Sequence, residues 1–250
     1  MINYIPYGRQ EITPEDIDAV VKVLKSDYLT QGPCIEIFED KLKAKLDANF
    51  AITTNSATSA LHLACLALNL TKDDILWTSP ISFVASANCA RYCSANVDFV
   101  DIDSSTGLIS ISKLESKLKE AQLRGKLPKI LIPVHLAGTS CDMKSIYDLS
   151  QRYGFKIIED ASHALGGRYL GQPVGNCKYS DITIFSFHPV KIITTGEGGV
   201  AVTNKHDLAA SMSMNRSHGI TKNSKEFQLK EYGPWSYEQQ TLGFNYRMND

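Results

Sequence analysis

The chain has 250 residues, 43% of them apolar, and its 27 acidic residues nearly balance its 26 basic residues. This apolar content is enough for a substantial core in one large domain. The near-zero net charge and the lack of a polybasic run argue against nucleic acid or an anionic membrane as a partner. No signal-peptide pattern opens the chain, and the most apolar run, residues 60–70, is too short and too polar to span a bilayer. We therefore expect a soluble cytoplasmic protein.

The six cysteines are scattered through apolar segments, at positions 34, 65, 89, 93, 141 and 177. Cys89 and Cys93 are four residues apart on a predicted helix, but no matching His or Cys pair follows them. A zinc site is therefore not predicted. We expect reduced and mostly buried thiols.

Two helices are predicted near the amino terminus. Thr13 can cap the first, Pro14 suits its first turn, and apolar residues at positions 17, 20, 21 and 24 follow at helical spacing up to residue 25. After a loop at residues 27–33, apolar residues at positions 37, 38, 42 and 46 predict a second amphipathic helix.

From residue 50 onward, short apolar strands alternate with helices. We predict strands at 50–53, 75–78, 97–102, 129–134, 155–159, 182–187 and 199–203, and helices at 56–68, 83–93, 112–124 and 143–153. This alternation indicates an α/β fold whose largely parallel central sheet is covered by helices on both faces. Ligands of such sheets bind beyond the carboxyl ends of the strands. Residues 243–250 have the pattern of a loop entering a helix.

Two segments after early strands allow either a structural or a binding role. Residues 55–60 read Asn-Ser-Ala-Thr-Ser-Ala and open a predicted helix, so they form either an ordinary helix cap or a phosphate site at the helix amino end. Phe83 follows the next strand and is either a core residue or the cover of a planar ligand.

A predicted buried strand ends in two carboxylates, Glu159 and Asp160. A carboxylate at the end of a parallel strand is costly unless it finds a partner. Structural acids at strand ends are common, and the residues alone leave a functional and a structural Asp160 open.

Lys191 lies between the apolar strand at 182–187 and a turn with three glycines in four residues, 196–199. Pro189 and these glycines impose a special backbone path. Burial in such a loop would lower the pKa of the lysine and let its neutral amine attack a carbonyl, so Lys191 is a candidate Schiff-base lysine. The alternative is an ordinary solvated surface charge.

These elements occur in the order that pyridoxal phosphate requires. Lys191 would hold the cofactor's aldehyde and later carry the proton, and Asp160 would keep the pyridine nitrogen protonated. Ser186, five residues before the lysine, could give its hydroxyl to the phosphate. The combination therefore indicates a pyridoxal 5'-phosphate enzyme.

The same motifs carry a family resemblance. At residues 55–61, 80–83, 100–103, 159–163, 186–199, 216–219 and 243–248 the chain resembles the DegT/DnrJ/EryC1/StrS family of sugar aminotransferases, which have the aspartate-aminotransferase-like fold (fold type I). Within it, Asn-Ser-Ala-Thr-Ser-Ala-Leu-His, Asp-Ala-Ser-His-Ala-Leu-Gly and Ser-Phe-His-Pro-Val-Lys look most like the transaminases that supply a pseudaminic acid precursor. The resemblance implies transfer of an amino group, from glutamate, to C4 of a UDP-linked 4-keto-6-deoxy-N-acetylhexosamine.

The resemblance also assigns roles to residues. Lys191 is implied to be catalytic, and the implied cofactor-binding residues are Ala57, Thr58, Phe83, Asp160, His163, Ser186, Lys191 and Asn245. His163 stands near the cofactor's phenolic oxygen, where many relatives have glutamine. Asn245 is implied to reach the neighbouring subunit's cofactor, which implies a homodimer with shared active sites. The implied substrate-binding residues are Tyr7, Asp27, Tyr28, Leu29, Thr30 and His188. For His188 and His218, a structural and a catalytic role both stay open.

Three departures from the family pattern stand out. Ala57 stands where many relatives have glycine, and Ile192 replaces a proline that is common after the lysine. Family members also continue into a smaller carboxyl-terminal domain, so we expect residues 1–250 to comprise an amino-terminal segment plus the cofactor-binding large domain, without that smaller domain.

Other functions remain as alternatives. The chain could aminate another nucleotide 4-keto sugar, or it could be a truncated and catalytically silent cofactor-binding protein. Relatives of the 3-dehydrase type replace the lysine by histidine, so Lys191 argues against that chemistry. A dinucleotide-binding dehydrogenase is disfavoured because no Gly-x-Gly-x-x-Gly follows an early strand.

Overall fold

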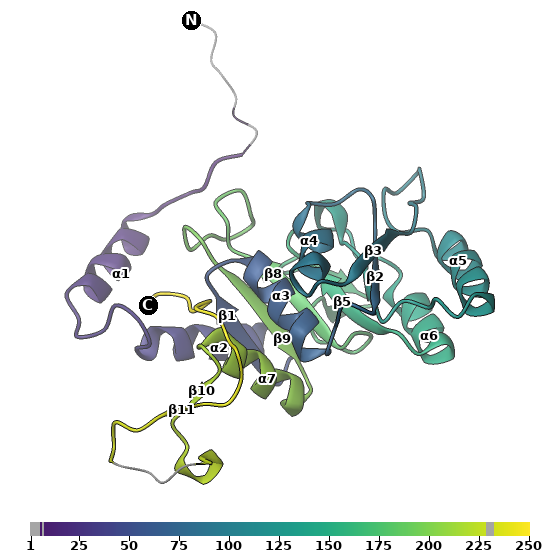
Figure 1. Ribbon diagram of the computed structural model, residues 1–250. Helices are drawn as coiled ribbons and strands as arrows, with labels where there is room; N and C mark the ends of the chain where they lie inside the picture. The colour runs from purple at the N-terminus through teal and green to yellow at the C-terminus, as the bar shows by residue number, and fades with distance from the viewer. Residues whose placement is uncertain (1–5, 7, 229–232) are drawn as a thin grey trace, which may run out of the picture.

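A seven-stranded sheet forms the centre of the part of the chain that the computed structural model describes, residues 6, 8–228 and 233–250 (Figure 1). Its strands lie in the order β1 (Phe50–Thr54), β9 (Gly199–Thr203), β8 (Ile182–Ser186), β5 (Lys156–Asp160), β4 (Ile130–Ile132), β2 (Ile75–Thr78) and β3 (Asn96–Phe99). Two short hairpins, β6 (Arg168–Tyr169) with β7 (Gln172–Pro173) and β10 (Ile220–Thr221) with β11 (Glu238–Gln239), complete the described strands.

The sheet is mainly parallel, as predicted. Strands β3, β2, β4, β5 and β8 pair in parallel, whereas β9 is antiparallel to both β8 and β1. The chain therefore turns back between β8 and β9, and residues 187–198 form the connecting loop that carries Lys191. The sequence pattern did not predict this reversal of direction.

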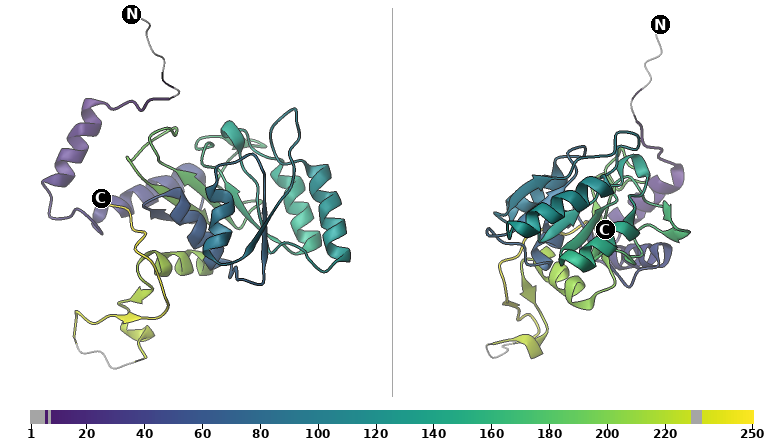
Figure 2. Two further views of the ribbon diagram at one scale, coloured as in Figure 1. Left: turned by 45° about the horizontal axis from the view of Figure 1, so that its top comes forward. Right: turned by 90° about the vertical axis from the view of Figure 1, so that its right-hand side faces the viewer.

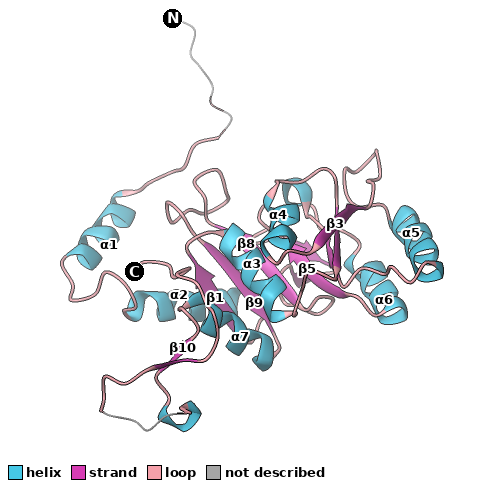
Figure 3. Cartoon of the chain, viewed as in Figure 1, coloured by secondary structure: helices cyan, strands magenta, loops and turns pink. Residues whose placement is uncertain are grey.

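Helices cover both faces of the sheet, which confirms the predicted layers. On one face, α3 (Ala57–Ala67), α4 (Ala85–Tyr92) and α7 (His206–Arg216) pack on the isoleucines of β1, β4, β5 and β8; Figure 3 shows α3 and α4 in front of the strands. On the other face, α5 (Ile111–Leu123) and α6 (Met143–Tyr153) pack on β2, β4 and β5, and α2 (Pro33–Leu46) packs on β1, β8 and β9. Helix α7 was not predicted.

Helix α1 (Pro14–Leu24) forms as predicted but buries none of its residues. A capping box starts it, because the Thr13 hydroxyl accepts from the Asp16 amide at 3.3 Å while the Asp16 carboxylate accepts from the Thr13 amide at 2.8 Å. Figure 1 and the left panel of Figure 2 show the helix standing apart from the sheet. Its apolar positions Ile17, Val20 and Leu24 are consequently exposed.

The segment 243–250 is not the start of a helix, and that prediction is wrong. Asn245 pairs with Ser217 and Asn249 with Thr30 as isolated β-bridges. The Asp250 carboxylate accepts from the Gly32 amide at 2.7 Å and from the Cys34 amide at 3.0 Å. Partners distant in sequence thus satisfy this backbone, which keeps it extended.

Several element boundaries also differ from the predicted ones. Strand β3 ends at Phe99 rather than at residue 102, and β4 covers only Ile130–Ile132 of the predicted 129–134. Helix α4 begins at Ala85, two residues after the predicted start.

Gly199 is where the sheet meets the first turn of α3, and it allows no side chain. A Cβ atom there would lie 2.4 Å from the Ala57 nitrogen and 2.6 Å from the Ala57 Cα. We predict that Gly199→Ala lowers the free energy of unfolding by about 1–3 kcal/mol, because backbone atoms must move apart. Urea unfolding measures the change. Gly8→Ala is the control, since nothing lies within 4 Å of its added Cβ. Equal stability of the two variants would contradict this packing.

Candidate active site

One open pocket lies at the carboxyl ends of the parallel strands. The structure brings seven of the predicted site residues together in its lining, namely Ala57, Thr58, Phe83, Asp160, His163, Ser186 and Lys191. They come from the ends of β1, β2, β5 and β8 and from the segments that follow these strands.

The amino end of α3 supplies free backbone amides to the pocket. Ser56 caps the helix, its hydroxyl accepting from the Ser59 amide at 3.2 Å. The first intrahelical bond runs from Ala60 to Ser56, and no acceptor in the described part of the chain contacts the amides of Ala57 or Thr58. Such amides, at the positive end of a helix, favour a phosphate group. Ser186 adds a hydroxyl from the end of β8.

Asp160 ends β5 as a buried carboxylate with hydroxyl partners. Its Oδ2 accepts from the Ser86 hydroxyl at 2.6 Å, and its Oδ1 accepts from the Ser162 hydroxyl at 2.7 Å. Sequence reasoning missed both serines. Ser162 could have been found as a turn residue two positions after the acid, whereas nothing in the sequence ties Ser86, on α4, to Asp160.

Lys191 lies half-buried in the loop between β8 and β9. Backbone bonds at Phe187 close this loop: its amide donates to Gly198 at 2.9 Å, and its carbonyl accepts from the Thr195 amide at 3.0 Å. Burial lowers the pKa of Lys191, and the negative charge of Asp160 partly opposes that shift. The shift favours the neutral amine, which is the nucleophilic form.

His163, in the segment after β5, lines the same pocket as Lys191 and Asp160. The Ala137 amide donates to His163 Nδ1 at 3.3 Å, so this nitrogen carries a lone pair. Burial and then the charge of Lys191 lower the pKa of His163, with Asp160 opposing. A neutral ring in this tautomer carries its hydrogen on Nε2, which is free to donate to an acceptor.

Phe83 lines the pocket with 72% of its surface exposed. The interpretation of Phe83 as a core residue is therefore wrong. An exposed ring at the mouth of a pocket can cover a flat ligand.

The remaining predicted residues lie outside this pocket. Asn245 is exposed, with its carbonyl 3.5 Å from the side-chain nitrogen of Asn55, near the start of α3. His188 and His218 are exposed, as is the loop with Asp27, Tyr28, Leu29 and Thr30. Tyr7 lies outside the described residues. The roles that the resemblance gives these residues stay predictions.

In the described ranges, no group of three or more His, Cys, Asp or Glu side chains could hold a metal ion. No helix found there is both long and apolar enough to cross a membrane. All six cysteines are free, and four of them are buried.

Removing the charge of Asp160 should change the pKa of Lys191 in a defined direction. The carboxylate raises that pKa, so Asp160→Asn should lower it further. Reductive methylation with ¹³C-formaldehyde followed by NMR titration measures the pKa of each lysine, and the variant Lys191→Arg assigns the Lys191 signal. A pKa of Lys191 that is unchanged or higher in Asp160→Asn would contradict this electrostatic effect of Asp160 on Lys191.

Solved structures share this fold. PseC from Helicobacter pylori, an aminotransferase involved in the biosynthesis of pseudoaminic acid, superimposes with a TM-score of 0.85 at 35% identity, covering 98% of this chain and 62% of PseC. The PLP-form of the putative sugar aminotransferase Spr1654 from Streptococcus pneumoniae matches with a TM-score of 0.83 at 28% identity, over 98% of this chain and 63% of its own. The predicted fold class is thereby confirmed.

Curated sequences place the chain in a family. It is 41% identical over 247 residues to the UDP-4-amino-4,6-dideoxy-N-acetyl-beta-L-altrosamine transaminase of Campylobacter jejuni strain 81-176, covering 98% of this chain. The chain spans about 61% of the length of that relative. The model of the DegT/DnrJ/EryC1/StrS aminotransferase family matches residues 10–250. With a match over almost its whole length, this chain belongs to the DegT/DnrJ/EryC1/StrS aminotransferase family.

Proposed function

We propose that the protein is a pyridoxal phosphate-dependent aminotransferase that moves an amino group from glutamate to C4 of a UDP-linked 4-keto-6-deoxy-N-acetylhexosamine, in nonulosonic (pseudaminic) acid biosynthesis. The observation that carries the proposal is the shared pocket of Lys191 and Asp160, beside the free amides of α3. The substrate class rests on the Campylobacter and Helicobacter relatives, which are named for this chemistry or pathway.

The residues present fit pyridoxal phosphate. The amides of Ala57 and Thr58 and the Ser186 hydroxyl would bind the phosphate, and the Asp160 carboxylate would face the pyridine nitrogen. Phe83 would cover the ring, while His163 Nε2 would donate to the phenolic oxygen. When bound, the cofactor supplies an aldehyde that holds the transferred nitrogen and a ring that accepts electrons from the reacting carbon.

The chain itself performs proton transfer and orientation. The amine of Lys191, whose pKa is lowered by burial, takes a proton from the α-carbon of the amino donor and later returns one to C4 of the sugar. With the cofactor bound, the Asp160 carboxylate would favour a protonated ring nitrogen, which would keep the ring electron-poor. Phe83, which is exposed and lines the pocket, would shield the bound ring from water.

A homodimer with shared sites is part of the proposal. The pocket mouth is apolar and exposed at Phe83 and around Lys191, where Val190 and Ile192 are also exposed. The apolar positions of α1 are uncovered as well. Such surfaces favour association with another chain. A second copy would place its exposed Asn245 at the phosphate of this site.

The lysine variant tests the proposed chemistry. Lys191→Ala should lose the visible absorbance of the cofactor-loaded protein and all turnover, whereas the exposed control Lys72→Ala should keep both. Turnover is followed by mass spectrometry of products from glutamate and a panel of UDP-4-keto sugars.

The possible outcomes separate the alternatives. Colour without any product would favour the silent cofactor-binding protein, and an amination product of another sugar would correct the substrate. An unchanged spectrum in Lys191→Ala would refute the assignment of Lys191.

Mixing two inactive variants tests the shared sites. A heterodimer of Lys191→Ala with Asn245→Ala has one site with both residues intact, so random mixing should restore about a quarter of the wild-type activity. Activity assays of each variant alone and of their re-equilibrated mixture measure this. If mixing restores no activity, Asn245 does not complete the site of the other subunit.

A further inference from the structure

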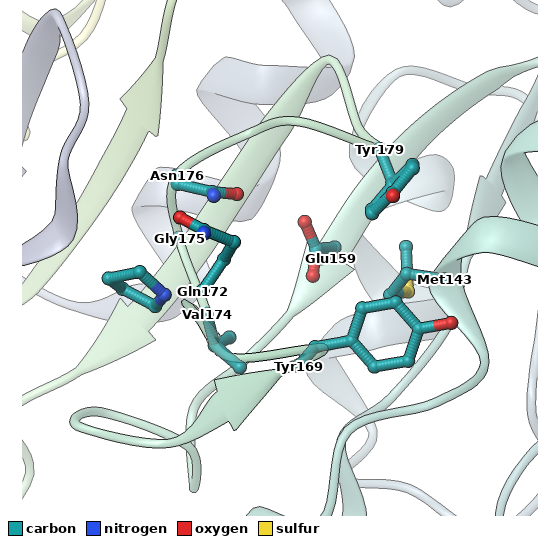
Figure 4. A pocket seen from close by; sticks show the side chains of 9 residues that line it. Met143, Glu159, Tyr169, Gln172, Val174, Gly175, Asn176 and Tyr179 are labelled. Carbon is teal, nitrogen blue, oxygen red and sulfur yellow. The ribbon is translucent and has the colours of Figure 1, made fainter.

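The two adjacent carboxylates at the end of β5 point to opposite faces of the sheet, as neighbours on a strand must. Asp160 lines the candidate active-site pocket. Glu159 points to the other face, into a second and small pocket among Met143, Tyr169 and Tyr179 (Figure 4). Nothing in the proposed reaction uses Glu159, although a buried charge is costly.

Glu159 is fully satisfied by partners within the fold. His135 Nε2 lies 2.8 Å from its Oε2, and the hydroxyls of Ser180 and Thr183 donate to its Oε1. Both members of the His135–Glu159 pair are buried. Burial works against ionisation, yet these hydrogen bonds hold the pKa of Glu159 below its ordinary value. An ionised carboxylate therefore accepts a hydrogen bond from His135 behind the active site.

His135 is fixed at its ring and at its backbone. Its Nδ1 accepts from the Cys141 amide at 3.2 Å, which leaves the hydrogen on Nε2 for Glu159. Its own amide donates to the Asp160 carbonyl at 3.0 Å, and the Asp160 amide donates to Pro133 at 3.0 Å. The position of His135 is thus tied directly to the backbone of Asp160.

The residues after His135 reach the active-site histidine. Ala137 and Gly138 have φ angles of 52° and 89°, so the chain reverses sharply there. The Ala137 amide holds His163 Nδ1, and a Cβ on Gly138 would lie only 2.8 Å from the His163 carbonyl oxygen. A shift of His135 would move this turn and release the ring of His163.

We propose that His135 and Glu159 are positioning residues, whose buried hydrogen bond holds Asp160 and the tautomer of His163 in place. Glu159 lies on the far face of the sheet, whereas His135 also lines the active-site pocket. The proposal deepens the proposed function and rests on it for the cofactor readout alone. The side-chain hydrogen bonds of His135 and Glu159 do not reach Asp160 or His163. The pair therefore acts through the backbone at residues 135–138.

Two substitutions of His135 separate hydrogen bonding from volume. Gln can donate an N–H to Glu159 from nearly the same place as Nε2, whereas Leu fills the space and donates nothing.

In cofactor-free protein, ¹H–¹⁵N NMR of the imidazole rings should show the lone pair of His163 on Nδ1 in wild type and His135→Gln. In His135→Leu the ¹⁵N chemical shifts of the two ring nitrogens of His163 should become averaged between the two tautomers. Cofactor affinity, from fluorescence titration, should fall about ten-fold or more in His135→Leu alone.

A matched control removes an ion pair at the amino end of β4, the strand that leads to His135. Lys129, which precedes β4, lies 2.8 Å from Asp74, so Asp74→Asn should reduce stability without changing the His163 signals. If His135→Leu does not fold, Glu159→Gln replaces it, and a smaller change in the same direction is expected.

The outcomes are distinct. The proposal is overturned if His163 keeps its tautomer in His135→Leu, or if His135→Gln and His135→Leu weaken cofactor binding equally. Absence of cofactor binding in wild type would defeat the proposed function instead, and the NMR comparison would still decide the positioning role.

Discussion

The electrostatic coupling between a buried carboxylate and a half-buried amine, Asp160 and Lys191, which line one pocket, is the constraint on which the site depends. Strands β5 and β8 are parallel neighbours, with Asp160 opposite Ile184, so their carboxyl ends open on the same edge of the sheet. The loop after β8 then returns through antiparallel β9, which holds Lys191 above that edge. Burying the carboxylate would be costly without the hydroxyls of Ser86 and Ser162 and the amine nearby.

The same reversal of the chain builds the phosphate end of the pocket. Strand β9 lies between β8 and β1, so Gly199 is opposite Ser186 and rests against Ala57. One glycine without a side chain therefore lets the Ser186 hydroxyl and the α3 amides reach a common point. The ends of β1, β5 and β8 and the segments after them thus supply the amides, the carboxylate, the hydroxyl and the amine of the site at one edge of the sheet.

Much of this fold could be predicted from the sequence because it follows from local periodicity. The alternation of apolar strands and amphipathic helices predicted the parallel sheet and its two helical layers. The direction of β9 could not be predicted, because an apolar strand pattern is the same for a parallel and an antiparallel strand. Helix α7 lacks a clear apolar stripe in its sequence, His-Asp-Leu-Ala-Ala-Ser-Met-Ser-Met-Asn-Arg, and residues 243–250 are extended only because of distant partners.

The site shows a similar division. Residues that end predicted strands, such as Asp160, or open a helix, such as Ala57, were predictable because parallel strand ends converge. Their supports were not, because Ser86 and His135 reach the site through tertiary packing. The alternation along β5 did hold a signal for Glu159, since it must face away from Asp160, but nothing in the sequence named His135 as its partner. Asn245 and the loop at 27–30 rest on resemblance and lie outside the pocket of this chain.

The most direct measurement of the central claim is chemical trapping. The protein loaded with pyridoxal phosphate is reduced with borohydride, digested, and mapped by mass spectrometry. Lys191 is half-buried, shares its pocket with Asp160 and has a lowered pKa, so we expect a phosphopyridoxyl group on the peptide that contains Lys191 and on no other. A label spread over exposed lysines, or none at Lys191, would contradict it.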